Sequence, residues 1–352
     1  MQLSELSRSA GEWLSGTGPE SDLVISSRIR LARNLEGHPF LSRANSRRRS
    51  RIEQEICEAL ESLRDRLGLF FLKLKTLHNV DRNVLMERHL ISREHAFAKV
   101  DRGVAFNASE DIAIMVNEED HLRLQVLRSG FQLRDTWTLM DELDTLLEER
   151  LPYAYDEQYG YLTVCPTNVG TGLRASVMLH LPALVMTQQV EKVFQAVSKI
   201  NLTVRGLYGE GTQALGDFYQ ISNQITLGRS EVEIIDNISE VIPKIIGYER
   251  TVRQTLLESK RTVLEDKVWR AYGTMKSART ISSKETLENL SMVRLGVNLG
   301  LIPGITSHMV NELFLLTQPG HLQKLEGSEL EPQARDVTRA SFIRRYMSKF
   351  PC

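Results

Sequence analysis

Apolar and polar positions alternate along a series of short segments in the first two thirds of the chain, a period typical of strands that bury one face of a sheet. The alternation predicts a strand that opens at Val24 and further strands at 70–76, 104–107, 111–117, 121–127, 160–164, 174–181, 202–207 and 218–226. Helical spacing predicts helices at 44–67, 135–151 and 183–199. Tight turns join the strands, so we expect a largely antiparallel sheet flanked by helices.

After Gly228 every periodic segment has the spacing of a helix. The predicted helices span 231–258, 261–275, 284–299, 305–316 and 333–347, with breaks at Gly273, 301–304 and 318–320. A length of 352 residues exceeds the roughly 250 to 300 at which single cores stop growing. We therefore predict an α+β protein with a sheet domain over 1–258 and an all-helical C-terminal domain over 259–352.

Composition narrows the class of protein. Of the residues, 41% are hydrophobic and 25% are charged, and the net charge is −1. No apolar run approaches the roughly 20 residues needed to cross a bilayer, and the first residues lack the segments of a signal peptide. The three cysteines, Cys57, Cys165 and Cys352, are too scattered for a disulfide framework or a zinc site. We expect a cytoplasmic protein that contacts no membrane and binds no nucleic acid directly.

Arginine outnumbers lysine, 32 to 12, among the 44 basic residues. One explanation is general, namely genome composition or a heat-adapted host. The other is functional, because the planar guanidinium makes paired hydrogen bonds to phosphate oxygens and several arginines can hold a polyanion. The positions of the arginines have to decide between these two explanations.

The segment 165–176, Cys-Pro-Thr-Asn-Val-Gly-Thr-Gly-Leu-Arg-Ala-Ser, contains the first candidate site. Its glycines fit the G-x-G-x-x-A dinucleotide fingerprint, but that fingerprint opens a helix and this segment continues into a predicted strand. A glycine turn that leads into a strand can still direct backbone N–H groups at an anion. A plain hairpin turn is the alternative interpretation.

Other arginines fall on predicted strands. Arg28 and Arg30 are two residues apart and therefore share one face of a strand. Arg123 follows an acidic turn, and Arg205 precedes a glycine loop that contains Glu210. Each fragment alone is typical of a solvated salt-bridge face. Together they repeat one arrangement, with arginines on strands and carboxylates on the turns at the strand ends.

Three stretches occur in an order found in one family: Val24-Ile-Ser-Ser-Arg-Ile-Arg, Asn117-Glu-Glu-Asp-His-Leu-Arg, and the segment 165–176. They resemble the signature segments of the ATP:guanidino phosphotransferases, the creatine and arginine kinase family, over about residues 20 to 255. The resemblance implies the guanidino kinase fold, ATP as the phosphoryl donor, and magnesium that arrives with ATP instead of at a metal site of the protein.

The resemblance implies a role for each matching residue. The implied ATP-binding residues are Ser26, Ser27, Arg28, Ile29, Arg30, His89, Arg123, Arg174, Ala175, Ser176, Val177, Met178, Arg205, Gly206, Leu207, Tyr208 and Gly209. The five arginines among them match the clamp on the nucleotide phosphates. His89 resembles the histidine on the adenine side, although a lone histidine is more often structural. Glu119 and Glu210 resemble the two carboxylates that grip the substrate guanidinium. Cys165 matches the cysteine that faces it, and a small buried hydrophobe is its alternative role.

The chemistry of such a reaction accounts for these residue types. A guanidinium is a poor nucleophile, because its pKa exceeds about 12 and it has no available lone pair. Two carboxylates can fix its plane, and one of them can take a proton as the nitrogen attacks. Preorganised arginines and magnesium can stabilise the negative charge that the transition state spreads over the phosphoryl oxygens.

The chain departs in two places from the metabolic members of the family. Only about 25 residues precede Arg28, where those kinases carry a helical domain that helps to enclose a small substrate. About 100 helical residues follow the catalytic region, where those kinases have no counterpart. An open guanidine site suits an arginine side chain carried by a protein. Both departures match the bacterial protein-arginine kinases, which phosphorylate arginines in proteins and thereby mark them for a chaperone-linked protease.

The segment 335–340, Arg-Asp-Val-Thr-Arg-Ala, resembles the element with which protein-arginine kinases bind phosphoarginine allosterically. The resemblance implies this role for Arg335, Asp336, Arg339 and Ala340. Arg335 and Arg339 are four residues apart on one helix face, where like charges repel unless an anion lies between them. The spacing alone also fits a solvated face.

The leading hypothesis is therefore a protein-arginine kinase of the stress response and protein quality control. The resemblance also implies a homodimer, an activator protein and chaperone-protease machinery as partners. A metabolic kinase of free arginine is one alternative, and a phosphoarginine-binding adaptor with a degenerate kinase fold is another. The presence of Glu119, Glu210 and the five clamp arginines speaks against the adaptor.

Overall fold

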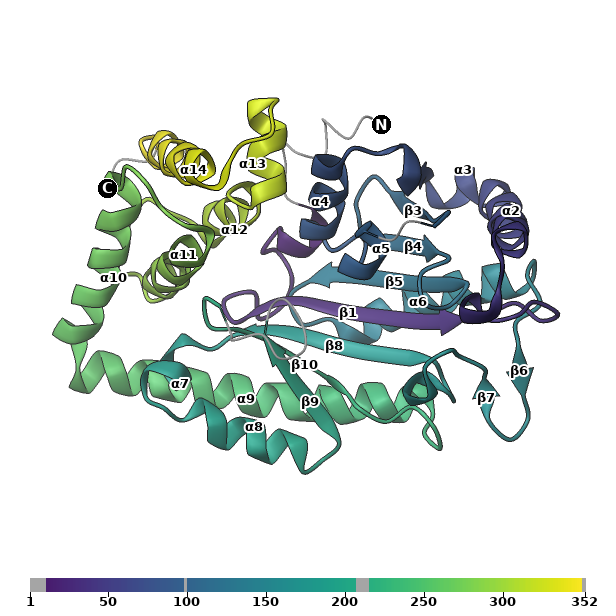
Figure 1. Ribbon diagram of the computed structural model, residues 1–352. Coiled ribbons are helices and arrows are strands. Elements are labelled where there is room, and N and C mark those ends of the chain that lie inside the picture. Colours follow the sequence, from purple (N-terminus) through teal and green to yellow (C-terminus); the bar gives the residue numbers. More distant parts are fainter. Residues whose placement is uncertain (1–10, 98–99, 207–214, 350–352) are drawn as a thin grey trace.

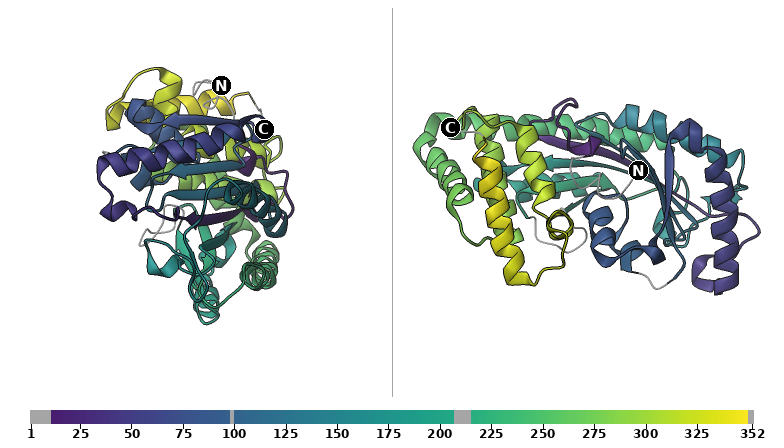
Figure 2. Two further views of the ribbon diagram at one scale, coloured as in Figure 1. Left: turned by 90° about the vertical axis from the view of Figure 1, so that its right-hand side faces the viewer. Right: turned by 90° about the horizontal axis from the view of Figure 1, so that it is seen from above.

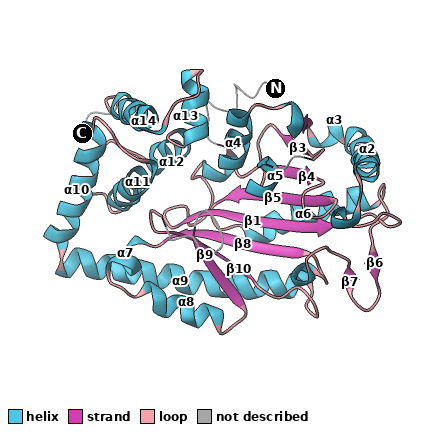
Figure 3. Cartoon of the chain, viewed as in Figure 1, coloured by secondary structure: helices cyan, strands magenta, loops and turns pink. Residues whose placement is uncertain are grey.

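The computed structural model describes residues 11–97, 100–206 and 215–349. In this part of the chain eight strands form one antiparallel sheet in the order β2-β3-β4-β5-β1-β8-β10-β9, as predicted for the fold class (Figures 1 and 3). The strands are β1 (Val24–Arg33), β2 (Leu69–Lys73), β3 (Gly103–Asn107), β4 (Ile112–Val116), β5 (Leu122–Ser129), β8 (Leu173–His180), β9 (Leu202–Gly206) and β10 (Phe218–Asn223). A separate ribbon consists of β6 (Tyr155–Asp156) and β7 (Gly160–Tyr161).

The helices fall into two groups. Those that precede Lys260 are η1 (Glu12–Leu14), η2 (Leu41–Arg43), α2 (Ser46–Ser62), α3 (Arg64–Leu67), η3 (Leu74–Thr76), α4 (Asn79–Glu87), α5 (Arg93–Phe97), α6 (Leu133–Glu148), η4 (Pro166–Asn168), α7 (Pro182–Met186), α8 (Val190–Ser198) and α9 (Glu231–Ser259). Those that follow are α10 (Arg261–Ser277), α11 (Ser283–Asn298), α12 (Ser307–Leu316), α13 (Pro319–Glu326) and α14 (Pro332–Met347). No helix in the described part of the chain is both long and apolar enough to cross a membrane.

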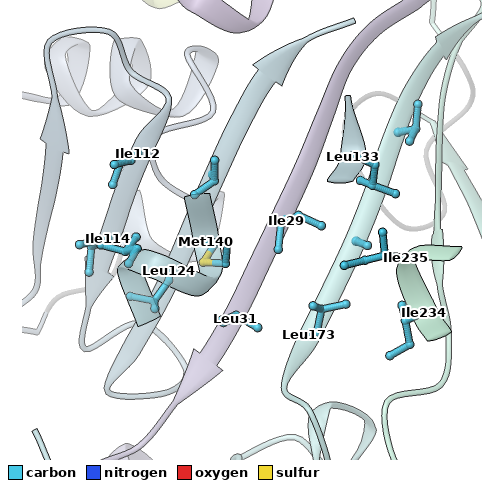
Figure 4. Close-up of a cluster of buried hydrophobic side chains, with 14 of the residues drawn as sticks. Ile29, Leu31, Ile112, Ile114, Leu124, Leu133, Met140, Leu173, Ile234 and Ile235 are labelled. Atoms are coloured by element: carbon cyan, nitrogen blue, oxygen red, sulfur yellow. The ribbon is translucent and has the colours of Figure 1, made fainter. Parts of the chain in front are cut away.

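The alternation of residues along the strands gives the sheet two unlike faces. On β1, Ile29 and Leu31 are fully buried and pack with residues of α6 and α9, which cover one face of the sheet (Figure 4). Arg28 and Arg30 lie between and beside them on the same strand, so their side chains point to the opposite face. The same period that fills the core thus places the cations on the face that α6 and α9 leave uncovered.

Local sequence signals position α9 beneath the sheet. Its first turn is closed by a capping box: the Ser230 backbone N–H donates to Glu233 Oε2 (2.8 Å), and the Glu233 N–H donates to Ser230 Oγ (3.3 Å). Ile234, Ile238 and Ile242 then follow at helical spacing, and all three are buried. The apolar stripe of α9 therefore faces the apolar side of the sheet.

A second core joins most of the C-terminal helices to one end of the sheet. It contains Ile25, Leu127, Met178 and Phe218 from the strands as well as the inner faces of α10, α11, α12 and α14. Figure 2 shows the C-terminal helices gathered at one end of the molecule and α2 at the other. The chain turns at Lys260, between α9 and α10. The division into two domains after residue 258 remains a prediction.

Several predicted strands are shorter in the structure; the one predicted at 218–226, for example, ends at Asn223. The strand predicted at 70–76 ends at Lys73 and continues as a 3₁₀ turn. The strand predicted at 160–164 keeps only Gly160–Tyr161, because the residues after it lead into the turn that holds Cys165. Alternation alone does not distinguish a paired strand from an extended connection.

The predicted helices need more correction. The break predicted at Gly273 is wrong, since α10 continues through it to Ser277. Pro319, in the break predicted at 318–320, opens α13, because proline is tolerated in the first turn of a helix. The helix predicted at 183–199 is divided into α7 and α8, with Gln188 in the left-handed region (φ 57°) between them. The helix predicted at 44–67 is interrupted after α2, and α4 and α5 were not predicted.

The packing of α9 gives a test of the fold. Ile238→Ala should lower the free energy of unfolding by about 2–5 kcal/mol, because it leaves a cavity against the sheet. Val232, on the same helix, is 57% exposed, and Val232→Ala should change the free energy of unfolding by less than about 0.5 kcal/mol. Chemical denaturation followed by circular dichroism measures both. Equal effects of the two substitutions would contradict the assigned orientation of α9.

Candidate active site

Five arginines lie on one face of the sheet. Arg30 of β1 pairs with Arg174 of β8, and cross-strand partners point to the same side. The registers place Arg28, Arg123 and Arg205 on that side too, from β1, β5 and β9. The sequence placed these residues on strands, and the fold brings them together from four strands.

The cluster is electrostatically unfavourable without a ligand. Burial, together with Arg123 and Arg174, lowers the pKa of Arg28 to about 9. Burial and the neighbouring arginines also hold the pKa of Arg30 well below its usual value. Arg30 Nε is buried and has no hydrogen-bond partner among the described residues. Grouped cations removed from water raise the free energy of the protein unless an anion joins them, so this face is built for a polyanion.

Two of these arginines donate to neutral groups, whereas Arg123 Nη1 donates to Glu118 Oε2 (3.3 Å). Arg28 Nη2 donates to Gln220 Oε1, and Arg174 Nη2 donates to Ser222 Oγ (3.1 Å). Both acceptors are neutral. In the described part of the chain, neither Arg28 nor Arg30 forms an ion pair with a carboxylate.

A cavity of about 500 Å³ lies over these strands. Arg28, Arg30 and Arg205 line it from the sheet, and Met86 and Phe97 line it from α4 and α5. It is therefore cationic on the side of the sheet, whereas the side of α4 and α5 mixes apolar residues with polar ones such as Asn83, Glu87 and Arg93. A cavity of this size falls in the range of small-molecule and cofactor sites, and its two parts fit the phosphates and the base of a nucleotide.

His89 borders the apolar part of the cavity. Burial, followed by the charges of Arg28 and Arg30, lowers the pKa of His89 to about 3, so its ring is neutral at pH 7. The ring meets the edge of Trp13 at a centroid distance of 4.8 Å. Gln125 Nε2 donates to the His89 carbonyl (2.6 Å) and fixes the segment to β5. A neutral imidazole suits an uncharged aromatic partner better than a phosphate.

The acidic turn at the end of β4 contains Glu118, Glu119 and Asp120, and the two glutamates differ in their surroundings. Glu118 is buried and accepts from Ser92 Oγ (2.6 Å) and Arg123 Nη1 (3.3 Å). Burial raises the pKa of Glu118, but Arg123 and Ser92 more than offset this and hold it below its ordinary value. Glu119 is exposed, and burial of part of its carboxyl, together with Asp120 and Glu118, raises its pKa. Glu119 is thus the more basic and the more accessible of the pair.

The turn that carries Cys165 is fastened beside these acids. Asp120 Oδ1 accepts from the Val164 N–H (2.8 Å) and from Asn34 Nδ2 (2.6 Å). Cys165 Sγ lies 3.0 Å from Thr167 Oγ1. A second cavity, of about 220 Å³, is bordered by Glu119 and Val164. The acidic turn and the cysteine turn therefore share one opening.

The glycines of the segment 165–176 allow neighbouring backbone segments to approach closely. Gly170 has φ 110°, and a Cβ there would lie 2.5 Å from the Thr226 carbonyl oxygen. Gly172 has φ 65°, and a Cβ there would lie 2.7 Å from the Ala32 carbonyl oxygen. A strand, β8, follows, so the rejection of the dinucleotide fingerprint is confirmed.

Not all of the predicted ATP-binding residues turn their side chains to the cavity. Ile29, Ala175 and Val177 are fully buried in the core on the opposite face, so only their backbone is available to a ligand. Ser27 Oγ donates to the Gly130 carbonyl (2.9 Å). Ser26, Ser176 and Met178 border a small recess beside Arg28 and His89. Gly206 lines the main cavity. Leu207, Tyr208, Gly209 and Glu210 lie outside the described residues.

The predicted phosphoarginine element lies on α14, away from the sheet. Arg339 is buried, and its Nε donates to the Thr317 carbonyl (2.8 Å) while Nη1 donates to the Ile281 carbonyl (2.9 Å) and to Asp336. Arg335 Nη1 is 3.5 Å from the Leu330 carbonyl oxygen, and Ala340 is buried. Asp336 offsets the charge of Arg339, so the two arginines coexist without a bound anion.

Sequence reasoning missed several cavity residues. Gln125 and Gln220 lie on the same strand faces as the arginines, so the period of two could have identified them. Phe314 and Gln318 also line the cavity but come from α12 and the turn after it. No local signal in the sequence connects those two residues with the sheet.

Comparison with known proteins agrees with the geometry. The model of the ATP:guanido phosphotransferase C-terminal catalytic domain matches residues 51–252, and the model of the protein-arginine kinase McsB C-terminal domain matches residues 261–351. The protein-arginine kinase of Halothermothrix orenii is 48% identical over 345 residues, which cover 98% of this chain and 99% of that protein. The protein-arginine kinase of Bacillus subtilis is 46% identical over 337 residues, which cover 94% and 92%.

Two solved structures have a similar fold. The duplicated taurocyamine kinase from Schistosoma mansoni, with bound transition-state analogue components, has a TM-score of 0.61 and 29% identity, and the match covers 71% of this chain and 36% of that one. Lombricine kinase has a TM-score of 0.60 and 26% identity, and the match covers 72% of this chain and 71% of that one.

The arginine cluster predicts opposite effects on stability and on binding. Arg30→Met should leave the ligand-free protein equally stable or more stable, because it removes a buried cation from a group of like charges. It should weaken binding of a nucleoside triphosphate by roughly 10- to 100-fold, the value of a lost charge-assisted hydrogen bond. Thermal unfolding with and without the nucleotide measures both, because a ligand that binds the folded state raises the transition temperature.

Arg51 provides the control for this substitution. Its side chain is 76% exposed, so Arg51→Met should change neither quantity. A large loss of ligand-free stability in Arg30→Met would contradict the description of the cluster as strained by its own charge.

Proposed function

The chain belongs to the ATP:guanido phosphotransferase family, among its protein-arginine kinases, and from this premise we propose that it transfers the γ-phosphoryl group of ATP to a guanidine nitrogen of arginine side chains in proteins. One observation carries the proposal: the buried arginines and the acidic turn form one electrostatic unit. Arg123 lowers the pKa of Arg28 on one side and opposes the rise in the pKa of Glu119 on the other. A phosphate donor and a cationic acceptor would therefore meet at Arg123.

The arginines bind the donor and stabilise the transition state. Arg28, Arg30 and Arg205 line the main cavity, and Arg123 and Arg174 lie on the same face of the sheet. Fixed guanidinium groups require no reorganisation as negative charge spreads over the phosphoryl oxygens. Charge on the phosphates in turn relieves the repulsion that lowers the pKa of Arg28. The repulsion that destabilises the ligand-free cluster is relieved when a polyanion binds, and this relief adds to the affinity for the polyanion.

Magnesium enters the proposal together with ATP. Within the described residues no group of three or more His, Cys, Asp or Glu is placed to hold a metal, and Glu118 is engaged by Ser92 and Arg123. Magnesium bound to the phosphates would neutralise part of their charge.

Glu119 is the proposed general base. The raised pKa of its carboxyl lies closer to the pKa of the guanidinium whose proton it must accept. Because Glu119 is exposed, an arriving guanidinium can reach it. The guanidine nitrogen forms a bond to the γ-phosphorus, the bond from that phosphorus to the bridging oxygen of ADP breaks, and the nitrogen proton passes to Glu119. Glu210 remains the proposed second carboxylate, and Cys165 the residue beside the guanidinium.

The acceptor enters through the cavity of about 220 Å³ at Glu119. Leu41 and Val164 also border this cavity and could contact the methylene groups of an arginine side chain. The relatives that match nearly the whole chain support a protein acceptor over free arginine, because they carry the name protein-arginine kinase. The homodimer, activator protein and chaperone-linked protease rest on the family resemblance, and the cytoplasmic location rests on composition. All of these stay predictions, as does phosphoarginine binding by the segment 335–340.

Replacement of the base tests the mechanism. Glu119→Gln should lower kcat by at least about 100-fold and leave the affinity for ATP unchanged, because a carboxamide cannot accept the proton. Steady-state kinetics and a separate nucleotide-binding measurement give both values. An unchanged kcat would rule out Glu119 as the base.

The pH profile of the same reaction has a matched control. The raised pKa of Glu119 places the acid limb of kcat/KM above the pH at which an ordinary glutamate ionises. Glu94 is an exposed acid whose charge helps to raise that pKa. Glu94→Gln should therefore keep kcat at neutral pH and move the acid limb to lower pH. A shift to higher pH would contradict the assignment.

The acceptor class has its own test. After incubation of a basic protein with the enzyme and magnesium ATP, mass spectrometry at neutral pH should detect phosphoarginine that disappears on acid treatment, since a phosphoramidate is acid-labile. The Glu119→Gln enzyme provides the negative control. ATP consumption with free arginine as the sole acceptor, and no modified protein, would support the metabolic alternative.

A further inference from the structure

One wall of the main cavity does not belong to the sheet or to the helices next to it. Phe314 near the end of α12 and Gln318 just before α13 line the same cavity as Arg28 and Arg30. Both residues lie outside 51–252, the range matched by the catalytic-domain family model. The C-terminal helices thus reach into a cavity whose cationic floor is supplied by the sheet.

The chemistry of this wall differs from that of the floor. Arg28, Arg30 and Arg205 supply positive charge from the sheet. The wall combines the apolar side chains Met86, Phe97 and Phe314 with the amides of Asn83 and Gln318, and it carries one charged group of each sign, Glu87 and Arg93. An aromatic ring, apolar side chains and amides are the groups that hold a planar base, and guanidinium groups are those that hold phosphates. The phosphates therefore belong on the sheet, and the base belongs between α4 and the end of α12.

Phe314 is held in place from behind. Its ring packs against Phe218 of β10 with a centroid distance of 5.0 Å and an interplanar angle of 66°. Gln318 Nε2 donates to the Phe314 carbonyl (3.0 Å), which ties the two wall residues to each other. Phe314 is 7% exposed, so a small face remains accessible toward the cavity. A side chain that is buried on most sides needs little ordering when a ligand binds.

Glu87, the last residue of α4, lines the cavity and also fastens this wall to the catalytic part of the chain. Its Oε1 accepts from the Gly320 N–H (2.7 Å), and its Oε2 accepts from the His321 N–H (3.0 Å) and lies 2.8 Å from His321 Nδ1. One carboxylate thus satisfies the first N–H groups of α13. The contact is close, because a Cβ on Gly320 would lie 2.8 Å from Asn83 Cβ.

A buried ion pair continues the connection toward His89. Arg88 donates through Nε to Glu110 Oε2 (2.8 Å), and both side chains are almost fully buried. Arg88 Nη1 lies 3.3 Å from His321 Nε2. The residue that follows Arg88 is His89, on the apolar side of the cavity. The position of α13 is therefore fixed relative to the site by a series of buried polar contacts.

We propose that Phe314 and Gln318 contact the base of the bound nucleotide, so that the C-terminal helices complete the ATP site, and that Glu87 is the positioning residue that holds this wall. The proposal rests on the function proposed above, since it takes the cavity to bind ATP. It adds a nucleotide-binding role for the helical region. Neither the period of the sequence nor the signature segments assigned such a role to these three residues.

The test compares ATP with inorganic tripolyphosphate, which has the phosphates and no base. Phe314→Leu keeps an apolar side chain of similar size but removes the ring, so the KM for ATP should rise roughly fivefold to tenfold. The dissociation constant of tripolyphosphate and the KM for the protein acceptor should stay unchanged. Gln318→Leu should also raise the KM for ATP and leave tripolyphosphate binding as it is.

Variants of Glu87 and Leu315 complete the experiment. Glu87→Ala should raise the KM for ATP and spare tripolyphosphate binding, and Glu87→Gln should restore part of the affinity, because its remaining oxygen can still accept from α13. Leu315 is buried in the same core but does not line the cavity, so Leu315→Ala should reduce stability without a selective effect on ATP.

Two results would overturn the proposal: ATP affinity that is unchanged in both wall variants, or an equal loss of ATP and tripolyphosphate affinity in them. A wild-type protein that binds ATP but phosphorylates no arginine would instead contradict the proposed function. It would leave the assignment of the wall intact.

Discussion

The site depends on a group of like charges that the fold forces together. Arg28 and Arg30 share a strand face with arginines of the neighbouring strands, and in the described part of the chain neither has a carboxylate partner. Burial and mutual repulsion lower the pKa of both, which means that the ligand-free protein holds these cations against their preference for water. A sequence selected for stability alone would not keep such a cluster. We therefore infer that the cluster is retained because it binds a polyanion, whose charge relieves the repulsion between the arginines.

The opposite face of the same strands provides the stability that the cluster lacks. The alternation that directs Arg28 and Arg30 outward directs Ile29 and Leu31 into a continuous apolar core with α6 and α9. Each such side chain contributes about 1.5–3 kcal/mol on burial, which exceeds the net value of most single polar contacts. The strand is therefore both the frame of the core and the support of the site. For this reason the arginines can be fixed in position before any ligand binds.

The period of two in the sequence was sufficient to locate most strands and to place Arg28 and Arg30 on one face, because those features depend on local geometry. It did not show where a strand stops pairing, as after Tyr161. Glu119 and Cys165 were singled out by the resemblance of the signature segments to the guanidino kinases, and their roles stay predictions. Contacts between distant segments were not predictable: Phe314 and Gln318 reach the cavity only because α13 packs against α4. The break expected at Gly273 failed because a glycine inside a helix costs only about 1 kcal/mol, which the packing of α10 outweighs. For Arg339, the sequence spacing indicated repulsion from Arg335. It could not show that Arg339 donates to the carbonyls of Thr317 and Ile281, which are distant in the sequence.

The turn between α12 and α13 is held from two directions. Glu87 binds the Gly320 N–H from the side of the nucleotide cavity, and Arg339 binds the Thr317 carbonyl from α14. A ligand that drew Arg339 away would free the carbonyl next to Gln318, so the predicted phosphoarginine element and the proposed base wall share one turn. Hydrogen bonds of charged groups contribute about 1.5–3 kcal/mol, which limits any coupling between the two sites to roughly tenfold to 150-fold in affinity. Because such coupling is reciprocal, ATP would alter the affinity at Arg339 by the same factor that a ligand at Arg339 alters the affinity for ATP.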